Sequence, residues 1–528
     1  MLFTSVKFVV FIAVLTLVYY AFVPRKERWG LLLIASLAFY WFADPRYLIF
    51  ISVTALTAYV FAIITEDYNS KRKAYLKANK DSFDSDSKKK YKATTTRVSR
   101  LLLVLSLLIN LGILATTKYT NFVIETVNSF RNEPLNFVNI IIPMGISFYT
   151  FQTVSYSIDI SRGTIKAQRN FFKFLLFTSF FPQLVQGPIS RYEDLSQTLY
   201  EPMPFEFRNF NLGFIRILWG YFKKLVIADR LVVALKALTA APDEYNRAFV
   251  FVVMMLYAAQ LYCDFTGGID ITIGIAQVLG IKVKENFDLP YFSKNIKEYW
   301  NRWHITMGTW FTDYIFYPLS VSPTMLKLSK WSRQHLGNAI GKRVTVYISC
   351  FCVWLATGIW HGAAWHFVVW GLMNFVVIMA SQELEPFYAK FHGKFGFKGK
   401  KWYSAFEILR TFLLMSSLKL FDCYRNVGLT FKMFGSMFIP TNIGKVFSGA
   451  LLELGLNKAD YTVACLAVVI VFLVSLYKKL KGKEVRESLY DNYYALFVLS
   501  CVALLLATLV FGAYGTGFDA SQFIYNQF

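Results

Sequence analysis

The stretch "VTVYISCFCVWLATGIWHGAAWHFVVWGLMNFVVIMASQ", residues 344–382, contains no Asp, Glu, Lys or Arg over its 39 positions. One membrane-spanning helix needs about 20 apolar residues, so this run is long enough for two spans. In its middle, the segment "WHGAAW" places small residues directly after His361. The sequence therefore predicts two membrane helices with a turn or a break near His361.

The rest of the chain repeats this apolar pattern. Hydrophobic residues make up 55% of the 528 positions and charged residues only 17%, below the roughly 25% of soluble domains. Backbone groups must be paired in hydrocarbon, and such continuous runs lack the alternation of a β-barrel, so the spans are helices. We expect an all-α polytopic membrane protein with about ten to thirteen membrane segments in one domain, 1–528. The further uncharged stretches are 8–23, 48–65, 101–117, 137–158, 248–263, 461–477 and 493–518.

The formal net charge of +23 is concentrated between the apolar stretches. Residues 71–100 hold eleven Lys or Arg against three Asp, and further basic loops occur at 327–343, 390–401 and 478–486. Basic loops between spans mark the cytoplasmic side, and they attract anionic lipid. We therefore predict a cytoplasmic loop at 66–100 and membrane lipids as partners, and we expect no nucleic-acid partner.

The cysteines and the histidine spacing give no sign of a metal site. The six cysteines have no paired spacing, so neither a disulfide framework nor a zinc site is indicated. The segment "HGAAWH" lacks both the intervening Glu and the i, i+4 histidine spacing of a zinc helix. We expect neither a bound metal nor a bound cofactor.

Proline and glycine interrupt two apolar segments, "IIPMGISFYTFQTVSYSID" at 141–159 and "FFPQLVQGPISRYED" at 180–194. Such breaks are tolerated in lipid only where protein or water surrounds them. The pattern favours re-entrant segments that line an internal cavity. We find no internal repeat, which argues against an inverted-repeat transporter.

His361 is the first candidate functional residue. Ionisable side chains within membrane runs are costly and usually face a cavity or a functional site. The small residues at 362–364 leave room beside the imidazole for a substrate. The alternative is a neutral histidine held by one hydrogen bond inside the bundle. His366 lies on a different face, and we interpret it as a packing residue.

His304 is the second candidate and lies in "IKEYWNRWHITMGTWF", residues 296–311. Read as one continuous helix, this segment places His304 on an apolar face at i, i+3 and i+4 spacing. We therefore predict that His304 is buried, as either a core histidine or a functional one. The rest of the predicted apolar face is Trp300, Trp303, Met307 and Phe311, whereas Lys297, Asn301 and Arg302 point away.

Two neutral imidazoles in an aromatic-rich cavity would suit proton abstraction from a hydroxyl group. An unperturbed histidine pKa near 6.5 leaves the base form available at physiological pH. No nucleophile elbow, P-loop or dinucleotide-binding fingerprint competes for the chemistry. His335 and His392 lie in basic loops and are expected to be solvated. The residues alone leave an enzyme, a transporter and a structural scaffold open.

Several blocks of the sequence resemble the membrane-bound O-acyltransferase (MBOAT) family. The longest is "LYCDFTGGIDITIGIAQVLGIKVKENFDLPYFSKNIKEYWNRWHITMGTWFTDYIFYPL", residues 261–319. The other blocks are "PMGISFYTFQTVSYSIDISRG", "FFPQLVQGPISRYEDL", "GYFKKLVIADRL", "GIWHGAAW" and "FDASQFIYNQF". They occur in family order within residues 137–528. The resemblance is closest to the bacterial branch of alginate O-acetyltransferase membrane subunits and teichoic acid D-alanyl transferases.

The resemblance implies a ring of helices around a tunnel, in which a cytoplasmic acyl donor meets a hydroxyl acceptor from the other face. By motif matching, His361 corresponds to the family's catalytic histidine and is the expected general base. His304 matches the second functional histidine, which would orient a substrate or polarise the thioester. The expected donor is acetyl-CoA, and the expected partner is an extracytoplasmic SGNH-type transferase in a bacterial cytoplasmic membrane.

Supporting residues follow from the same motifs. We expect the acids of "DFTGGID" to fix helices or line the tunnel, the neighbours of His304 to hold it in place, and Trp360 and Gln183 to line the tunnel or its wall. The substrate stays open, because "YPLSVSP" and "TGGID" depart from the usual motifs. O-acetylation of a cell-surface polysaccharide is the leading hypothesis, and D-alanyl transfer to teichoic acid is the alternative. The predicted supporting residues are Asp264, Asp270, Asn301, Arg302, Trp303, Trp360 and Gln183.

Overall fold

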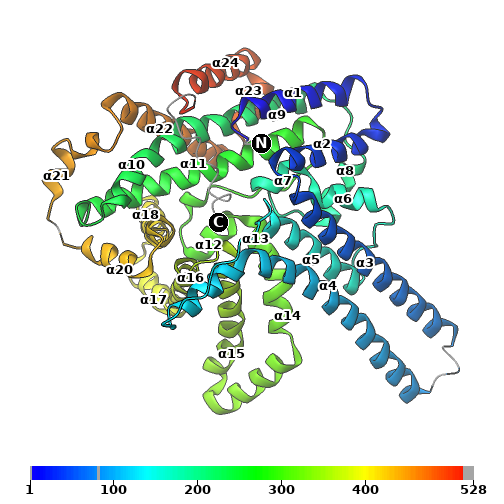
Figure 1. Cartoon of the computed structure of the whole chain (residues 1–528). Coiled ribbons are helices and arrows are strands. Elements are labelled where there is room, and N and C mark those ends of the chain that lie inside the picture. Colours follow the sequence, from blue (N-terminus) through cyan, green and yellow to red (C-terminus); the bar gives the residue numbers. More distant parts are fainter. Residues whose placement is uncertain (1–2, 80–81, 83, 440, 515–528) are drawn as a thin grey trace. The chain divides into compact units, whose positions relative to one another are not determined.

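The computed structural model describes residues 3–79, 82, 84–439 and 441–514, and the block "FDASQFIYNQF" lies outside them. The chain divides into two compact units, Met1–Phe210 with Ile275–Lys284, and Asn211–Gly274 with Glu285–Phe528. The all-α prediction is confirmed (Figure 1). Within the described part, the only β-type pairing is an isolated bridge between Phe287 and Trp303.

Twenty-four α-helices and five short 3-10 or π segments make up the described regular structure. The helices up to the second unit are α1 Val6–Ala21, η1 Arg25–Glu27, α2 Arg28–Ala43, α3 Tyr47–Ala78, α4 Ser85–Asn128, α5 Ile146–Arg162, α6 Phe171–Ser179, α7 Phe181–Gln186 and α8 Tyr192–Tyr200. The remaining helices are α9 Phe207–Tyr221, η2 Phe222–Ala228, α10 Asp229–Ala240, α11 Ala248–Val278, η3 Pro290–Phe292, α12 Ile296–Arg302, α13 Ile305–Phe311, η4 Thr312–Phe316, α14 Tyr317–Ser320, α15 Pro323–His361, α16 Trp365–Glu383, α17 Glu385–Phe395, α18 Lys401–Leu418, α19 Leu420–Tyr424, α20 Val427–Ser436, α21 Ile443–Phe447, η5 Ala450–Glu453, α22 Lys458–Lys481, α23 Val485–Asn492 and α24 Tyr494–Phe511.

Seven helices of the described part are long and apolar enough to cross a membrane: α3, α4, α11, α15, α16, α22 and α24. This number is lower than the predicted ten to thirteen membrane segments. The other predicted stretches form shorter helices, such as the 16-residue α1. In the stretch 137–158, the helix starts only at Ile146, because Pro143 and Gly145 interrupt the chain before it.

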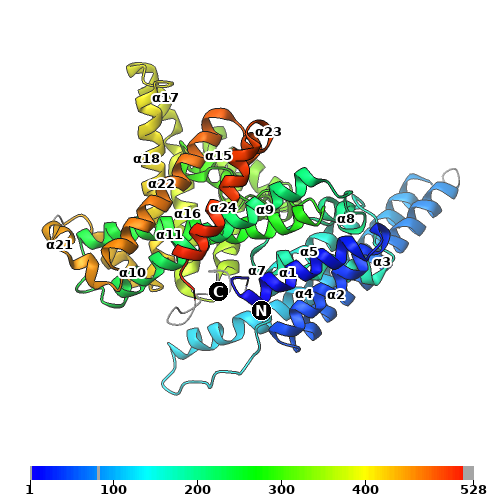
Figure 2. The same ribbon diagram turned by 90° about the horizontal axis from the view of Figure 1, so that it is seen from above.

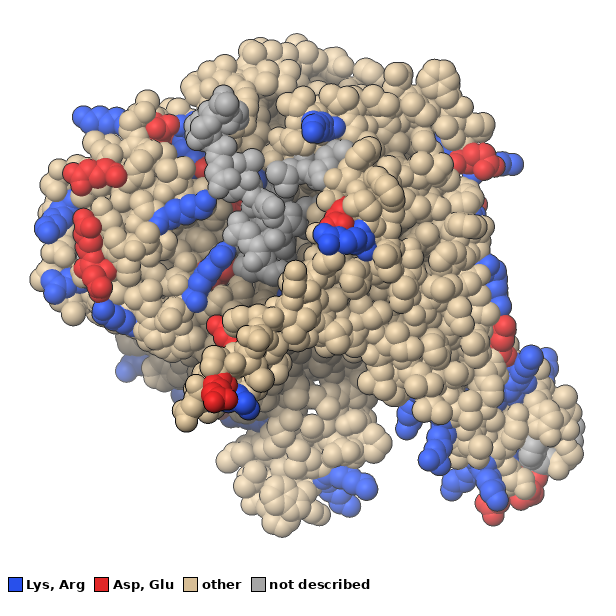
Figure 3. Space-filling view, viewed as in Figure 1, with Lys and Arg blue, Asp and Glu red and all other residues tan. Residues whose placement is uncertain are grey.

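In the first unit, α3 and α4 run side by side as a long hairpin (Figures 1 and 2). The predicted basic loop 66–100 is largely helical, since α3 continues to Ala78 and α4 begins at Ser85. The rings of Tyr75 and Tyr91 contact each other in a tilted arrangement near the tip, with centroids 5.0 Å apart. Lys and Arg gather at this tip, whereas the face over the apolar parts of the hairpin carries few charges (Figure 3). Its cytoplasmic location stays a prediction.

The two segments interrupted by proline and glycine contact each other in this unit. Gly145 has a φ of 73°, and a Cβ added there would lie 2.2 Å from the carbonyl oxygen of Leu184 in α7. Gln183 is buried, and its amide nitrogen donates to the Ser190 hydroxyl at 2.5 Å, while the Gln152 amide donates to its oxygen at 3.1 Å. The predicted breaks are therefore present, and their re-entrant passage into a membrane stays a prediction.

In the second unit, glycines bring α9 into close contact with α11. A Cβ added to Gly220 would lie 2.6 Å from the carbonyl oxygen of Gly267, and one added to Gly274 would lie 2.9 Å from that of Gly213. Small residues at such crossings let helix backbones approach closely in membrane proteins. The "TGGID" block of α11 is thus part of a tight helix interface.

We predict that Gly220→Ala destabilises the protein by about 1–3 kcal/mol, because the new methyl group would overlap backbone that cannot move away cheaply. Gly112→Ala in α4 is the matched control, since nothing lies within 4 Å of a Cβ added there. That control should raise stability by about 0.5–1 kcal/mol, because alanine loses less backbone entropy in a helix than glycine does. Thermal unfolding of both variants in the same detergent measures the difference, and equal shifts would contradict the close contact.

Candidate active site

His361 is the last residue of α15, at the predicted break between two spans. Gly362 has extended backbone geometry, with a φ of −173°, and α16 begins at Trp365. A Cβ on Gly362 would lie 2.3 Å from the Phe367 ring, so only glycine fits there. The break predicted near "WHGAAW" is therefore confirmed.

Two more glycines fix the packing of α15 on α16. A Cβ on Gly358 would lie 2.6 Å from the carbonyl oxygen of Phe367, and a Cβ on Gly371 would lie 2.4 Å from that of Trp354. This close packing leaves the His361 ring against Trp370, with centroids 4.7 Å apart, and beside Trp360 at 5.2 Å. His366 is buried against Phe367 at a centroid distance of 4.2 Å.

A small cavity of about 50 Å³ adjoins His361. Aromatic rings form most of its wall, and Trp300, Trp303 and Trp370 are among them. Lys419 and Asp422 contribute the charged groups, and Met415 completes one side. A titratable imidazole therefore lines a partly open cavity that has a mainly aromatic wall and two charged residues.

His304 is fully buried, as predicted, but the helix expected around it is not continuous. The α12 helix ends at Arg302, and His304 has a left-handed conformation with a φ of 51° before α13 starts. The cause is pairing with segment 286–288: Asp288 N–H donates to the Arg302 carbonyl at 3.0 Å, and Ile305 N–H donates to the Asn286 carbonyl at 2.9 Å. These bonds replace those of a helix. The left-handed region costs a non-glycine residue roughly 1–2 kcal/mol.

Asn286 holds the His304 ring. Its side-chain oxygen lies 3.2 Å from His304 Nδ1 and also accepts from the Thr306 N–H and hydroxyl, at 3.0 and 2.9 Å. Because this oxygen only accepts, we assign the ring proton to Nδ1 and the lone pair to Nε2. Burial, and secondarily the nearby His361, lowers the pKa of His304 well below its usual 6.5 and favours the neutral form.

Trp360 lies between the two histidines. Its ring centroid is 6.0 Å from that of His304 and 5.2 Å from that of His361. The structure therefore brings both predicted histidines to one tryptophan. His304 does not belong to the residues that line the small cavity, whereas His361 does.

The neighbours of His304 have different surroundings. Trp303 is buried and stacks on Tyr299, with ring planes 12° apart. Asn301 is exposed, and Arg302 pairs with Glu298 at 2.9 Å. Of these three predicted residues, only Trp303 lines the cavity.

The two acids of α11 form buried ion pairs with consecutive lysines of η2. Asp264 pairs with Lys224 at 2.6 Å, and Asp270 pairs with Lys223 at 2.6 Å. The η2 segment is a π-helix, a geometry that often occurs at functional positions. Both acids thus fix α11 against η2, which is one of the two roles predicted for them.

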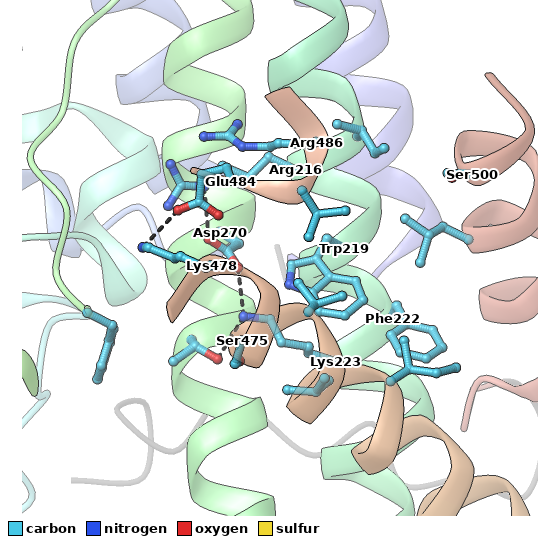
Figure 4. Close-up of a pocket in the computed structure, with 18 of the residues that line it drawn as sticks. Arg216, Trp219, Phe222, Lys223, Asp270, Ser475, Lys478, Glu484, Arg486 and Ser500 are labelled. Carbon is cyan, nitrogen blue, oxygen red and sulfur yellow. Dashed lines mark hydrogen bonds and ion pairs between the residues drawn. The ribbon is translucent and has the colours of Figure 1, made fainter. Parts of the chain in front are cut away.

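Asp270 also lines a second, larger cavity of about 410 Å³ (Figure 4). The Nε of Arg216 donates a hydrogen bond of 2.8 Å to the Asp270 carboxylate. The two terminal nitrogens of Arg216 donate hydrogen bonds of 2.6 Å each to the Glu285 carboxylate. Trp219 and Phe222 form part of the apolar wall. The cavity therefore has one charged side and one apolar side.

Comparison with known proteins identifies the domain that carries these groups. Residues 160–418, which contain both histidines, match the model of the membrane-bound O-acyltransferase family. The chain carries an MBOAT domain. With the seven apolar helices found among its described residues, it is a multi-pass protein of the cytoplasmic membrane.

Relatives of the chain that carries this domain have three kinds of names. The "Probable alginate O-acetylase AlgI" of Pseudomonas syringae is 31% identical over 350 residues, 65% of this chain and 61% of the relative. The "Peptidoglycan O-acetyltransferase" of Helicobacter pylori is 30% identical over 321 residues, 56% of this chain and 57% of the relative. The "Teichoic acid D-alanyltransferase" of Bacillus subtilis is 29% identical over 281 residues, 52% of this chain and 67% of the relative. The chain spans about half to two thirds of these proteins.

Sequence reasoning missed Lys419 and Asp422, which directly follow the matched MBOAT segment. They are the only charged residues between Arg410 and Arg425. The rule that singled out His361, that ionisable groups in apolar runs are costly, would also have found them. The same rule would not have found Asn286, because it is not ionisable and lies in a polar segment, where asparagine is common.

We predict that Asp270→Asn in the MBOAT protein lowers stability by about 3–5 kcal/mol, since Arg216 and Lys223 would both lose a buried partner. Asp243→Asn is the control, because the Asp243–Lys432 pair at 2.8 Å is largely exposed and exposed pairs contribute little. Thermal unfolding of both purified variants measures the effect. Similar melting temperatures for the two variants would show that Asp270 is not a structural clamp.

Proposed function

We propose that this protein is an O-acyltransferase that moves an acetyl group from a cytoplasmic thioester donor, acetyl-CoA, across the bacterial cytoplasmic membrane. There the group serves the O-acetylation of a cell-surface polysaccharide. The observation that carries the proposal is His361, placed at a helix break inside the MBOAT domain and lining a small cavity. The names of the alginate and peptidoglycan relatives support acetyl as the group transferred.

The size of the cavity favours a short acyl group. A water molecule needs roughly 10–15 Å³ of such space. The cavity of about 50 Å³ therefore accommodates a few non-hydrogen atoms, as an acetyl group has, and no long acyl chain. A long-chain acyl donor is disfavoured for the same reason.

His361 acts as the general base in this mechanism. The imidazole takes the proton of the acceptor hydroxyl while its oxygen bonds to the acyl carbon. The C–S bond of the thioester then breaks, and the imidazolium returns the proton to the departing thiolate, which releases free CoA. No covalent enzyme intermediate and no metal is needed. His304 acts as a positioning residue through Trp360.

D-alanyl transfer from a carrier protein to teichoic acid is the second candidate. The name of the Bacillus subtilis relative supports it, and the Asp422 carboxylate in the cavity could pair with the ammonium group of a D-alanyl thioester. In either case, an extracytoplasmic SGNH-type transferase is the proposed partner that passes the acyl group to its final acceptor. A transporter or an inactive scaffold would need no proton acceptor at His361.

We predict that His361→Ala lowers acyl transfer by about 10²- to 10⁴-fold, the usual cost of removing a general base. Release of free CoA thiol from acetyl-CoA, with the extracytoplasmic partner co-expressed, measures turnover of purified protein in nanodiscs. His335→Ala is the control, because that exposed ring contacts only its neighbour Trp331, by stacking at 4.7 Å and by a 2.9 Å hydrogen bond to its carbonyl, among the interactions of the described residues, and should leave turnover unchanged.

The outcomes separate the candidate functions. Equal turnover in wild type and well-folded His361→Ala would make His361 a packing residue and contradict the mechanism. A wild-type protein that ignores acetyl-CoA but consumes a D-alanyl-loaded carrier protein would replace acetyl transfer by the second candidate. No turnover with either donor would favour a transporter or a scaffold.

A further inference from the structure

Lys419 is a buried basic residue at the cavity beside His361. It follows the last residue of α18, and only 6% of its surface is exposed. Its ammonium nitrogen lies 4.2 Å from the Trp303 ring centroid and 4.5 Å from that of Tyr291. It also donates a hydrogen bond of 2.6 Å to the Tyr291 hydroxyl. Aromatic faces and one hydroxyl therefore fix the position of this group.

The ammonium group of Lys419 lacks a carboxylate partner among the described residues. Asp422, three residues later, accepts from the Tyr257 hydroxyl and forms no ion pair with Lys419. An ammonium group has three donors, and the described residues use one of them. Burial lowers the pKa of Lys419 well below its usual value, and a buried donor without an acceptor is costly, so such groups usually serve a ligand.

The cavity also holds other polar atoms that have no partner in the described part of the chain. These atoms are the Trp300 Nε1, the Tyr299 hydroxyl and one carboxylate oxygen of Asp422. All three residues line the same cavity as His361 and Lys419. Their convergence indicates that a polar group of a ligand completes the hydrogen bonding.

We propose that Lys419 is a catalytic residue that binds the acyl carbonyl oxygen and stabilises the negative charge that develops on it. This inference rests on the proposed acyl transfer. As the acceptor oxygen bonds to the acyl carbon and His361 takes its proton, the carbonyl π electrons move onto the oxygen beside Lys419. They return when the C–S bond breaks, and the leaving sulfur takes the proton from His361.

This assignment gives His304 and Lys419 different roles. The resemblance implies that His304 orients a substrate or polarises the thioester, but its buried ring does not line the cavity. Lys419 does line it, and only 6% of its surface is exposed. The assignment holds for an acetyl or a D-alanyl donor, because both contain the same carbonyl.

The test compares Lys419→Met with Lys432→Met in the full-length protein, using acetyl-CoA and the co-expressed partner. The substitution is the same in both, but Lys432 is exposed and does not line the cavity. We expect kcat to fall about 10²- to 10³-fold in Lys419→Met, the cost of losing one oxyanion donor, with little change in KM. Lys432→Met should leave kcat unchanged, and Lys419→Arg should recover part of the loss.

Each other outcome contradicts one specific statement. Wild-type kcat in folded Lys419→Met, or a raised KM at constant kcat, would overturn the role of Lys419 while acyl transfer stands. Absence of wild-type turnover with acetyl-CoA and with a D-alanyl-loaded carrier would overturn both proposals. If Lys419→Met does not fold, Tyr291→Phe decides, because it keeps the ring and removes the hydroxyl that fixes the ammonium group. Unchanged kcat in that variant would overturn the role.

Discussion

A helix can end inside a membrane protein only where other parts of the chain enclose its last turn, and the candidate site depends on such an end at His361. Glycines allow the neighbouring helix to pack closely enough to enclose this helix end. With Gly358 and Gly371 at the crossing, α15 and α16 approach until backbone touches backbone, and Gly362 lets the chain pass the Phe367 ring. A bulkier residue at any of these positions would separate the helices and open the cavity beside the imidazole.

A chain of ionic and polar contacts connects α11 to the second histidine. Asp270 accepts a hydrogen bond from Arg216, and the two terminal guanidinium nitrogens of Arg216 donate to the Glu285 carboxylate. The next residue, Asn286, holds His304 through its side chain and pairs with Ile305 through its backbone. The left-handed conformation of His304 persists because these contacts on both sides determine it. Asp270 is thus connected to the site through a series of contacts, without touching it.

Long uncharged runs were sufficient to predict membrane helices, because the length of a span is set by bilayer thickness. They also located the break at His361, since 39 residues exceed one span and "HGAA" offers the smallest side chains. The region of His304 was harder. Its apolar spacing correctly indicated which residues are buried, but pairing with 286–288 replaced the helix, and periodicity within one segment cannot reveal a partner segment.

The two histidines differ in what they can touch, and this difference follows from burial. The His304 ring is fully buried and lies beside Trp360, and it does not line the cavity. His361 and Lys419 both reach that cavity, one as a base and the other as a cation. Acyl transfer needs both properties at one carbonyl, because a proton leaves the attacking oxygen while negative charge appears on the carbonyl oxygen. A cavity this small brings the two groups to the same few atoms.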